Sequence, residues 1–267
     1  MEVIIKPNYE ELSKYAAEII SRQIQEKPNS VLGLATGSTP EGLYKEIVRM
    51  RKEKALDFSK IVTFNLDEYY GLAIDSKQSY ACFMHENLFK HININQENAH
   101  IPDGKIPLQE IENYCRQYEN KIKENRGIDL QILGIGIDGH IGFNEPGSSL
   151  YSRTRLVVLD KTTIDTNWEK FFKKDGIAKE NASSFAITMG IGTIFEAGRI
   201  LLMASGKSKA DIVAKFIEGP VTSQVPASFL QLHPNVSVIL DEDAASKLQR
   251  YEHYKYSMGE RKKLERK

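Results

Sequence analysis

The sequence predicts an α/β fold in which a mostly parallel, doubly wound sheet lies between two layers of helices. Short apolar runs alternate with amphipathic helical stretches through the 267 residues. This alternation is typical of parallel strands joined by crossover helices. Because no repeat, low-complexity tract or composition break marks a linker, we expect residues 1–267 to form a single three-layer domain.

The strands of this sheet are predicted from short runs rich in branched apolar residues and bounded by turn-forming residues. The runs cover residues 3–5, 31–35, 61–66, 130–135, 185–188, 200–204 and 236–240. Since most of them are apolar at nearly every position, they are expected to be buried on both faces of one sheet.

Helices are predicted where apolar residues recur three or four positions apart, as in residues 9–24 and 111–122. Residues 243–267 are also expected to be helical, and they become polar and basic after Arg250. Cys82 and Cys115 fall in helical patterns without Cys-x-x-Cys spacing. Both are therefore predicted to be reduced thiols rather than disulfide or zinc partners.

The charge balance points to a small-molecule partner. Lys plus Arg number 36 and Asp plus Glu number 36, so the formal net charge is zero. No broad positive field is predicted to attract nucleic acid or an anionic membrane. The N-terminus lacks a secretory signal pattern and no stretch approaches the roughly 18 apolar residues of a membrane span, so a cytoplasmic location is expected.

The most informative segment is 133–146 (LGIGIDGHIGFNEP), a glycine-rich turn that follows an apolar run. The carboxyl ends of parallel strands are where open α/β sheets bind ligands. Asp138, His140 and Glu145 supply titratable groups there, and the pattern predicts proton transfer. In the plainer alternative, Asp138 caps a helix and His140 packs as a neutral imidazole.

An anion site is predicted at the junction 34–44 (LATGSTPEGLY), where a strand gives way to a helix. Gly37 bends the chain, and the free amides of the helix start can bind an anion together with the hydroxyls of Thr36, Ser38 and Thr39. A capped helix start without a ligand is the alternative for this segment.

Two further junctions carry charged side chains. In segment 64–72 (FNLDEYYGL), Asp67 leaves an apolar strand at the predicted ligand edge, where a carboxylate is well placed to take a proton from carbon. We assign Asp67 to the ligand, and we expect Glu68 either to hold the loop by hydrogen bonds or to pair with a cation. In segment 204–213, Lys209 near a helix start is predicted to reach the same anion, although the Walker pattern is not completed.

Together these motifs resemble the glucosamine-6-phosphate deaminase (glucosamine-6-phosphate isomerase) family in order and spacing. The motifs that carry the likeness are segments 35–40 (ATGSTP), 64–69 (FNLDEY), 136–146 (GIDGHIGFNEP) and 206–210 (GKSKA). The resemblance implies a single modified Rossmann-like domain without organic cofactor or catalytic metal. It also implies conversion of glucosamine 6-phosphate and water to fructose 6-phosphate and ammonia.

The resemblance also implies roles for individual residues. His140 would assist opening of the sugar ring, with Asp138 and Glu145 orienting its imidazole and tuning its proton affinity. Asp67 would move a proton from C2 to C1, and the resulting imine would be hydrolysed. The family's phosphate-holding positions match Gly37, Ser38, Thr39 and Lys209 in this sequence.

The sequence departs from the family at two positions. Where the family commonly has a phosphate-binding arginine before paired phenylalanines, this chain has Lys170, which lacks the bidentate fork of arginine. Lys170 is assigned to phosphate on that likeness alone. Hexameric members that respond to N-acetylglucosamine 6-phosphate place a lysine where this chain has Val157, so weak or absent activation is expected.

Several alternatives stay open at this point. A 6-phosphogluconolactonase would share the fold and a sugar phosphate, and a transcription regulator's sensing domain would bind the sugar phosphate without reaction. Asp138, His140 and Glu145 are also metal-ligand types. The sequence decides neither between glucosamine and galactosamine 6-phosphate nor between a monomer and a homo-oligomer.

Overall fold

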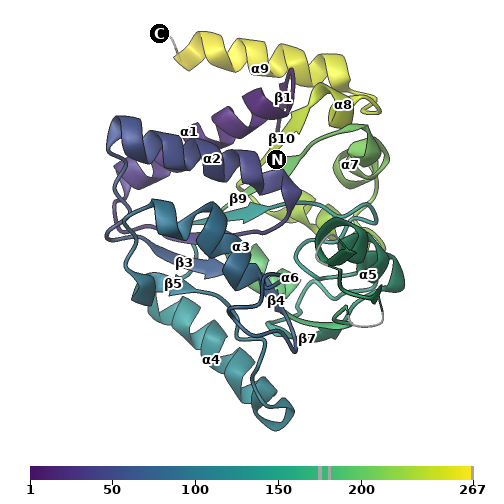
Figure 1. Ribbon diagram of the computed structural model, residues 1–267. Coiled ribbons are helices and arrows are strands. Elements are labelled where there is room, and N and C mark those ends of the chain that lie inside the picture. The colour runs from purple at the N-terminus through teal and green to yellow at the C-terminus, as the bar shows by residue number, and fades with distance from the viewer. Residues whose placement is uncertain (174–175, 180–181, 266–267) are drawn as a thin grey trace.

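The computed structural model describes residues 1–173, 176–179 and 182–265, except for the side chains of residues 170, 171, 262 and 265. Within this part of the chain, a seven-stranded parallel sheet forms the centre of the molecule (Figure 1). Its strands, in spatial order, are β1 (Glu2–Lys6), β10 (Val236–Asp241), β9 (Arg199–Ala204), β6 (Leu130–Leu133), β2 (Val31–Leu34), β3 (Val62–Asn65) and β5 (Ala99–His100). The prediction of a mostly parallel α/β fold is confirmed.

The order of the strands explains why helices cover both faces of the sheet. From β1 the chain crosses to β2 and proceeds outward to β5, then returns to β6 and proceeds in the opposite direction. Right-handed connections place helices of the first half on one face and those of the second half on the other. The helices are α1 (Tyr9–Glu26), α2 (Ser38–Lys54) and α3 (Tyr80–Asn87), then α4 (Ile111–Glu124), α6 (Ile191–Phe195) and α7 (Ala210–Glu218).

Helix α1 illustrates how sequence fixes these elements. The Asn8 side chain caps the helix by accepting a hydrogen bond from the Glu11 amide at 2.9 Å. Leu12, Ala16 and Ile20 form a stripe at helical spacing that is completely buried against the sheet. Burial of this stripe stabilises the packing of α1 on the face of the sheet that α2 also covers.

A second, three-stranded antiparallel sheet stands beside the first, with the order β4 (Asp67–Tyr69), β8 (Phe185–Thr188), β7 (Arg155–Val158). The prediction that residues 185–188 belong to the main sheet is therefore wrong. An apolar run signals burial but does not specify which strand will pair with it. Here the chain bends after β3, and β4 offers β8 an antiparallel partner.

Shorter helices connect these elements. They are α5 (Lys161–Asn167), a π-helical turn (Trp168–Phe172) and 3-10 turns at Phe89–His91, Gln96–Asn98, Leu108–Glu110, Lys207–Lys209 and Pro226–Leu232. Cys82 lies in α3 and Cys115 in α4, both as free thiols, as the sequence predicts.

The C-terminal segment contains two helices rather than the continuous one expected. After α8 (Glu242–Ala245) the chain breaks, and α9 (Tyr251–Glu265) then lies along β1 at one end of the molecule (Figure 1). The Glu218 carboxylate stabilises the break by accepting the amides of Gln249 and Arg250 at 2.8 and 2.9 Å.

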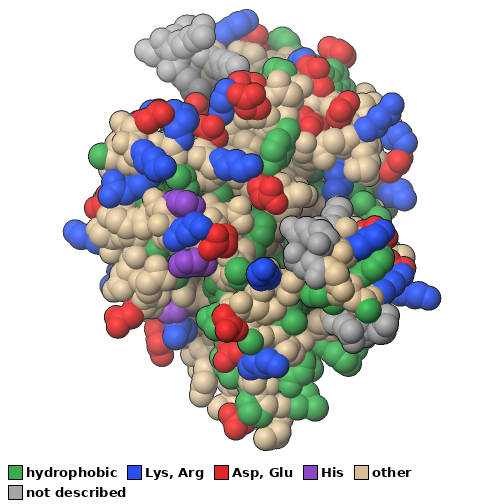
Figure 2. All heavy atoms as spheres, in the orientation of Figure 1, with side chains coloured by type: hydrophobic (Ala, Val, Ile, Leu, Met, Phe, Trp, Pro, Cys, Tyr) green, Lys and Arg blue, Asp and Glu red, His purple; other side chains and the backbone are tan. Residues whose placement is uncertain are grey.

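The surface agrees with the balanced composition. Positive and negative side chains are interspersed over the face shown in Figure 2. Among the described residues, no helix combines the length and apolar character needed to cross a membrane.

Candidate active site

A cavity of about 150 Å³ lies at the carboxyl ends of the central strands. Its walls come from the turns after β2 and β6, from Leu66 and Asp67 after β3, from Lys209 after β9, and from α5. Strands β2 and β6 are neighbours from which the chain proceeds in opposite directions. Such a switch point is the usual ligand site of an open α/β sheet.

The adjacent acids Asp67 and Glu68 have different surroundings. Glu68 is buried and accepts three backbone hydrogen bonds, from Tyr69 at 2.8 Å and from Tyr80 and Ala81 at 2.9 Å. It therefore fixes the start of α3. Asp67 instead lines the cavity, as its assignment to the ligand predicts. Of the two roles open to Glu68, the structure shows the one in which it holds the chain by hydrogen bonds.

Burial strongly affects the proton affinity of Asp67. Only 5% of the residue is exposed. Desolvation first, and then the nearby charge of Glu68, raise its pKa to about 8, although the charge of His140 acts in the opposite direction. A carboxylate with a raised pKa in a cavity is a stronger base than an ordinary aspartate, and it suits proton abstraction.

The turn after β6 folds tightly around His140. The Gly136 amide donates to the His140 carbonyl at 2.9 Å, and the Gly139 amide donates to the Gly136 carbonyl at 3.1 Å. Gly142 has a φ of +57°, and a Cβ atom there would lie 2.9 Å from the Thr188 hydroxyl. Glycine is therefore required at position 142 by both conformation and space.

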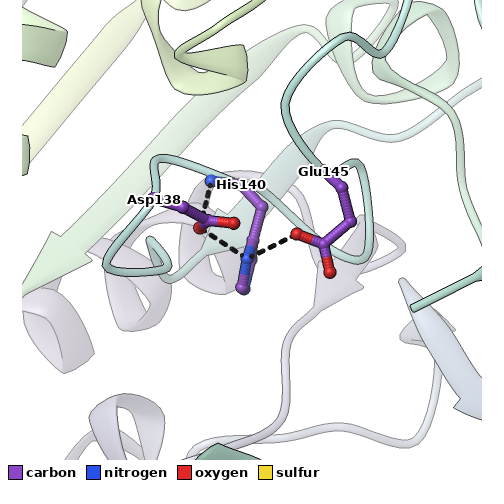
Figure 3. A group of neighbouring side chains, drawn as sticks. All are labelled: Asp138, His140 and Glu145. Atoms are coloured by element: carbon purple, nitrogen blue, oxygen red, sulfur yellow. Dashed lines mark hydrogen bonds and ion pairs between the residues drawn. The ribbon is translucent and has the colours of Figure 1, made fainter. Parts of the chain in front are cut away.

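His140 lies between two carboxylates (Figure 3). Its Nδ1 atom is 2.8 Å from Asp138 Oδ1 and 3.5 Å from Glu145 Oε2. Burial by itself would lower the pKa of His140, but hydrogen bonds and charges from Asp138 and Glu145 outweigh it and raise this pKa to about 9. The imidazole thus carries a proton near neutral pH in the ligand-free protein.

The same interactions act on Asp138. Its partial burial favours the neutral acid, but the hydrogen bond and charge of His140 prevail, and the pKa of Asp138 lies well below its usual range. A permanently ionised Asp138 orients the imidazole and stabilises its protonated form.

Another part of the cavity wall has the features of an anion site. Thr36, Gly37, Ser38 and Thr39 line it at the start of α2, where the first amides have no intrahelical acceptor. The Tyr9 hydroxyl of α1 holds this turn in place. It accepts a hydrogen bond from the Gly42 amide at 2.7 Å, and its own hydrogen is directed to the carbonyls of residues 38 and 39.

Lys209 contributes a positive charge to the cavity wall. Its Nζ atom donates to the Ile135 carbonyl at 2.7 Å, which directs the ammonium group to the end of β6. The structure thus brings Lys209 and the 36–39 turn to one cavity. Lys170 was assigned to the same anion, but its side chain lies outside the described residues, and its role stays a prediction.

The antiparallel sheet ties Asp67 to the His140 turn. Thr188 pairs with Asp67 on one side and with Arg155 on the other. Its hydroxyl accepts the Phe143 amide at 3.0 Å. The Asn144 side chain donates to the Met189 carbonyl at 2.8 Å and accepts from Arg155 at 2.9 Å. Two segments distant in sequence are thereby held in a fixed relation.

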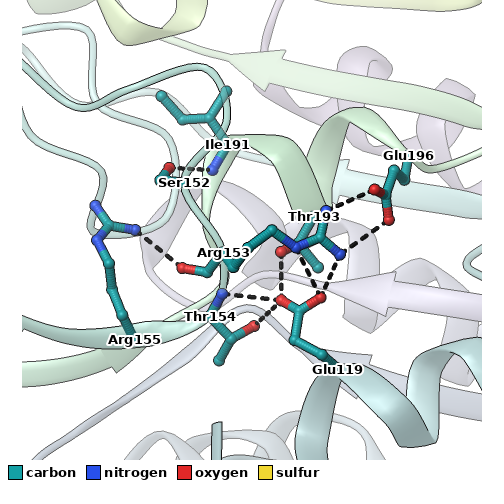
Figure 4. Close-up of polar contacts among 8 residues, drawn as sticks. All are labelled: Glu119, Ser152, Arg153, Thr154, Arg155, Ile191, Thr193 and Glu196. Atoms are coloured by element: carbon teal, nitrogen blue, oxygen red, sulfur yellow. Dashed lines mark hydrogen bonds and ion pairs between the residues drawn. The ribbon is translucent and has the colours of Figure 1, made fainter. Parts of the chain in front are cut away.

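A buried glutamate, Glu119, holds the segment that leads into β7 (Figure 4). Glu119 on α4 accepts the Thr154 amide at 2.8 Å and is also bonded by the hydroxyls of Thr154 and Thr193. Arg153 pairs with Glu119 and with Glu196. These contacts anchor the strand that presents Arg155 to Asn144.

Part of the cavity wall was not predicted from the sequence. Helix α5 contributes four polar residues, namely Thr162, Thr163, Thr166 and Asn167, and α3 contributes Tyr80. A helix-capping signal was present for α5, since Asp160 accepts the Thr162 amide at 2.9 Å. Nothing in the sequence pattern, however, placed this helix over the cavity.

Asp138, His140 and Glu145 could also hold a cation, because their ligand atoms all lie within 4.8 Å of one another. The donor set of one imidazole and two carboxylates is chemically suitable. A cation would have to displace the proton on His140.

Comparison with known proteins places the chain in a family. The family model for glucosamine-6-phosphate isomerases/6-phosphogluconolactonase matches residues 7–239. A glucosamine-6-phosphate deaminase from Thermoanaerobacter pseudethanolicus is 54% identical over 246 residues, which are 92% of this chain and 94% of the relative. One from Clostridium novyi is 52% identical over 248 residues, which are 93% of this chain and 100% of the relative.

Solved structures agree with the sequence comparison. A monomeric glucosamine-6-phosphate deaminase superposes with a TM-score of 0.88 at 45% identity, covering 92% of this chain and 100% of that one. A 6-phosphogluconolactonase from Trypanosoma cruzi has a TM-score of 0.71 at 22% identity, over 93% and 97% of the two chains. The second likeness concerns the fold alone.

Proposed function

Because the chain belongs to the glucosamine-6-phosphate isomerase/6-phosphogluconolactonase family, we propose that it converts glucosamine 6-phosphate and water to fructose 6-phosphate and ammonia. The reaction couples an aldose–ketose isomerisation to deamination in amino-sugar catabolism. The relatives at 54% and 52% identity over nearly the whole chain are glucosamine-6-phosphate deaminases, which favours this reaction over lactone hydrolysis or ligand sensing.

One structural observation carries the proposal. A buried carboxylate, Asp67, and a carboxylate-bound imidazole, His140, line the same cavity as the anion-binding start of α2. An open aminosugar phosphate needs this arrangement, with phosphate held at one end and acid–base groups at the other. A merely capped helix and a packed histidine would not require a shared cavity.

In the first step the protonated His140 gives its proton to the ring oxygen as the C1–O5 bond breaks. The C1 hydroxyl returns a proton to the imidazole and becomes the aldehyde. Asp138 and Glu145 hold the imidazole ring of His140 in place and stabilise its positive charge. The net result is transfer of one proton from O1 to O5.

In the second step the ionised Asp67 removes the proton from C2 while the protonated His140 gives its proton to O1, which gives an enolamine. Asp67 then delivers its proton to C1, and C2 becomes an iminium carbon. Water adds to C2, the C2–N bond breaks to release ammonia, and the remaining proton returns to His140, so fructose 6-phosphate is formed. General acid–base groups of this kind contribute about 100- to 10,000-fold each.

The phosphate is assigned to Thr36, Gly37, Ser38, Thr39 and Lys209. Amides and hydroxyls at a helix start hold phosphate oxygens, and the lysine adds a point charge. A cytoplasmic location fits this substrate, because an anionic sugar phosphate does not enter hydrocarbon unaided.

The proposal is tested by measuring ammonia and fructose 6-phosphate in a coupled assay with glucosamine 6-phosphate. Hydrolysis of 6-phosphogluconolactone is measured in parallel. We expect both products in equal amounts and little lactone hydrolysis. Lactone hydrolysis without ammonia release would contradict the proposal.

The phosphate assignment has a matched control in the same turn. Lys209 lines the cavity, whereas Lys207 is exposed and lies outside it. Lys209→Met is expected to raise KM about 10- to 100-fold, as for loss of a charged hydrogen bond, while Lys207→Met leaves KM unchanged. Equal effects of the two substitutions would remove Lys209 from the phosphate site.

A further inference from the structure

Tyr80 lines the cavity with an aromatic ring whose position is closely fixed. Its amide donates to Glu68 at 2.9 Å. The ring stacks on Phe143 at a centroid distance of 6.0 Å and an interplanar angle of 6°, and it contacts Tyr69 at 4.8 Å. Two aromatic neighbours and a buried carboxylate therefore determine where the Tyr80 hydroxyl lies.

That hydroxyl belongs to a side chain that lines the same cavity as Thr36 of the anion-binding turn and as Asp67. It donates to the Tyr69 hydroxyl over 3.3 Å. This is longer than the usual 2.5–3.0 Å of a hydroxyl pair, so a substrate hydroxyl can compete for the donor.

The substrate's chemistry shows which of its atoms would meet Tyr80. If the phosphate on C6 binds the 36–39 turn and C2 lies beside Asp67, the carbons between them carry hydroxyl groups. A side chain that lines the same cavity as Thr36 and Asp67 is placed to meet this middle section. A neutral phenol can donate to and accept from such hydroxyls.

We propose that Tyr80 is a substrate-binding and specificity-determining residue whose hydroxyl hydrogen-bonds the hydroxyl on C3 or C4 of the sugar. This rests on the proposed function and extends it, because C4 is the centre at which glucosamine and galactosamine 6-phosphate differ. A site built to bond a hydroxyl discriminates strongly against an analogue that lacks it.

Packing alone is the competing explanation for Tyr80. Its ring joins an apolar cluster with Tyr69 and Phe143. Tyr80→Phe separates the two explanations, because phenylalanine keeps the ring and its stacking and removes only the hydroxyl. Tyr69→Phe is the matched control, since Tyr69 is buried and does not line the cavity.

The experiment compares kcat/KM of wild type, Tyr80→Phe and Tyr69→Phe on glucosamine 6-phosphate and on its 3-deoxy and 4-deoxy analogues. Tyr80→Phe is expected to lose about 10- to 100-fold on glucosamine 6-phosphate. On one of the two analogues it should equal wild type, because the bond is already missing. Tyr69→Phe should keep the wild-type ratios among the three substrates.

Two results would overturn the proposal. One is a Tyr80→Phe variant as active as wild type on all three substrates, and the other is an equal loss on all three. Failure of the proposed function gives a different result, because wild type itself would then release no ammonia from glucosamine 6-phosphate. A melting temperature within a few degrees of wild type verifies that each variant is folded.

Discussion

Gly136 and His140 are packed so closely that a Cβ atom on residue 136 would lie 2.3 Å from the imidazole Cε1 atom and 2.4 Å from Nδ1. It would also lie 2.6 Å from Asp138 Oδ1. Real Cβ atoms do not approach other atoms this closely, so any side chain at position 136 must displace the imidazole or its carboxylate. The absence of a side chain at residue 136 thus allows the imidazole and Asp138 to take their observed positions.

Gly136→Ala is therefore expected to lower kcat at least about 100-fold, because a displacement of about 1 Å in a reacting group has an effect of this size. Substrate binding at the phosphate end should be much less affected. Gly259→Ala is the control, since a Cβ atom there meets open space far from the cavity. Full activity of Gly136→Ala would show that His140 does not need its observed position.

Asp67→Asn is expected to abolish turnover while retaining binding of fructose 6-phosphate. Asparagine keeps the shape of the side chain but cannot accept the proton from C2. Ammonia release and calorimetric titration with fructose 6-phosphate measure the two properties separately. A fully active variant would remove the C2 base from the proposed mechanism.

The same substitution is expected to stabilise the fold at alkaline pH. The unfolded carboxyl loses its proton near pH 3.8, whereas burial raises the pKa of folded Asp67 to about 8. The proton on folded Asp67 thus contributes stability that is fully present below pH 3.8 and is lost as pH rises through about 8. Asp67→Asn should therefore raise the melting temperature above that of wild type by more as the pH rises over this range. At its upper end, the free energy of unfolding of the variant is expected to exceed that of wild type by about 1–3 kcal/mol. An advantage that does not change with pH would contradict the burial argument.

A chelator is expected to leave activity unchanged. Asp138, His140 and Glu145 have a ligand set that could hold a cation, but the two carboxylates raise the pKa of His140 to about 9 despite its burial. A metal must displace this proton to bind. Ammonia release is measured after treatment with EDTA and dialysis. Loss of activity that added zinc restores would indicate a catalytic metal.

N-acetylglucosamine 6-phosphate is expected not to activate the protein. At the position where responsive hexameric members have a lysine, Val157 packs against the apolar cluster that contains Phe143. An apolar side chain cannot hold a phosphate group. Substrate saturation curves with and without the N-acetyl compound should coincide, and a leftward shift on its addition would refute the expectation.

The sequence was sufficient to predict six of the seven strands of the main sheet, but not the two-residue strand β5. It also predicted the strand ends that bring Asp67, His140 and Lys209 to the cavity. Glycine turns after apolar runs mark the carboxyl ends of parallel strands, and these ends meet at one edge of a sheet. Asp67, His140 and Lys209 could for this reason be assigned to a common site, although they lie on separate segments. The contrast between Asp67 and Glu68 follows from adjacent residues pointing in different directions.

The sequence could not predict the antiparallel sheet that joins these segments. Its contacts depend on long-range pairs such as Thr188 with Phe143 and Glu119 with Thr154. Hydroxyls and carboxylates of this kind leave no periodic pattern, because each bond depends on one position only. The cavity wall formed by Tyr80 and α5 escaped prediction for the same reason.

The dependence of kcat/KM on pH should be bell-shaped, because it reports the acid and the base of the free enzyme. The rate should rise as Asp67, with its pKa raised to about 8 by burial, becomes ionised. It should fall as His140, with its pKa raised to about 9, loses its proton. The maximum is therefore expected between about pH 8 and 9.

Glu145→Gln tests the assignment of the alkaline limb. Glu145 is one of two carboxylates that raise the pKa of His140, so its neutralisation should move the alkaline limb to lower pH. The acidic limb should move less, because Glu145 is not among the groups that shift the pKa of Asp67. If the alkaline limb instead kept its wild-type position, the proton lost there would not be that of His140, and another group would have to open the ring.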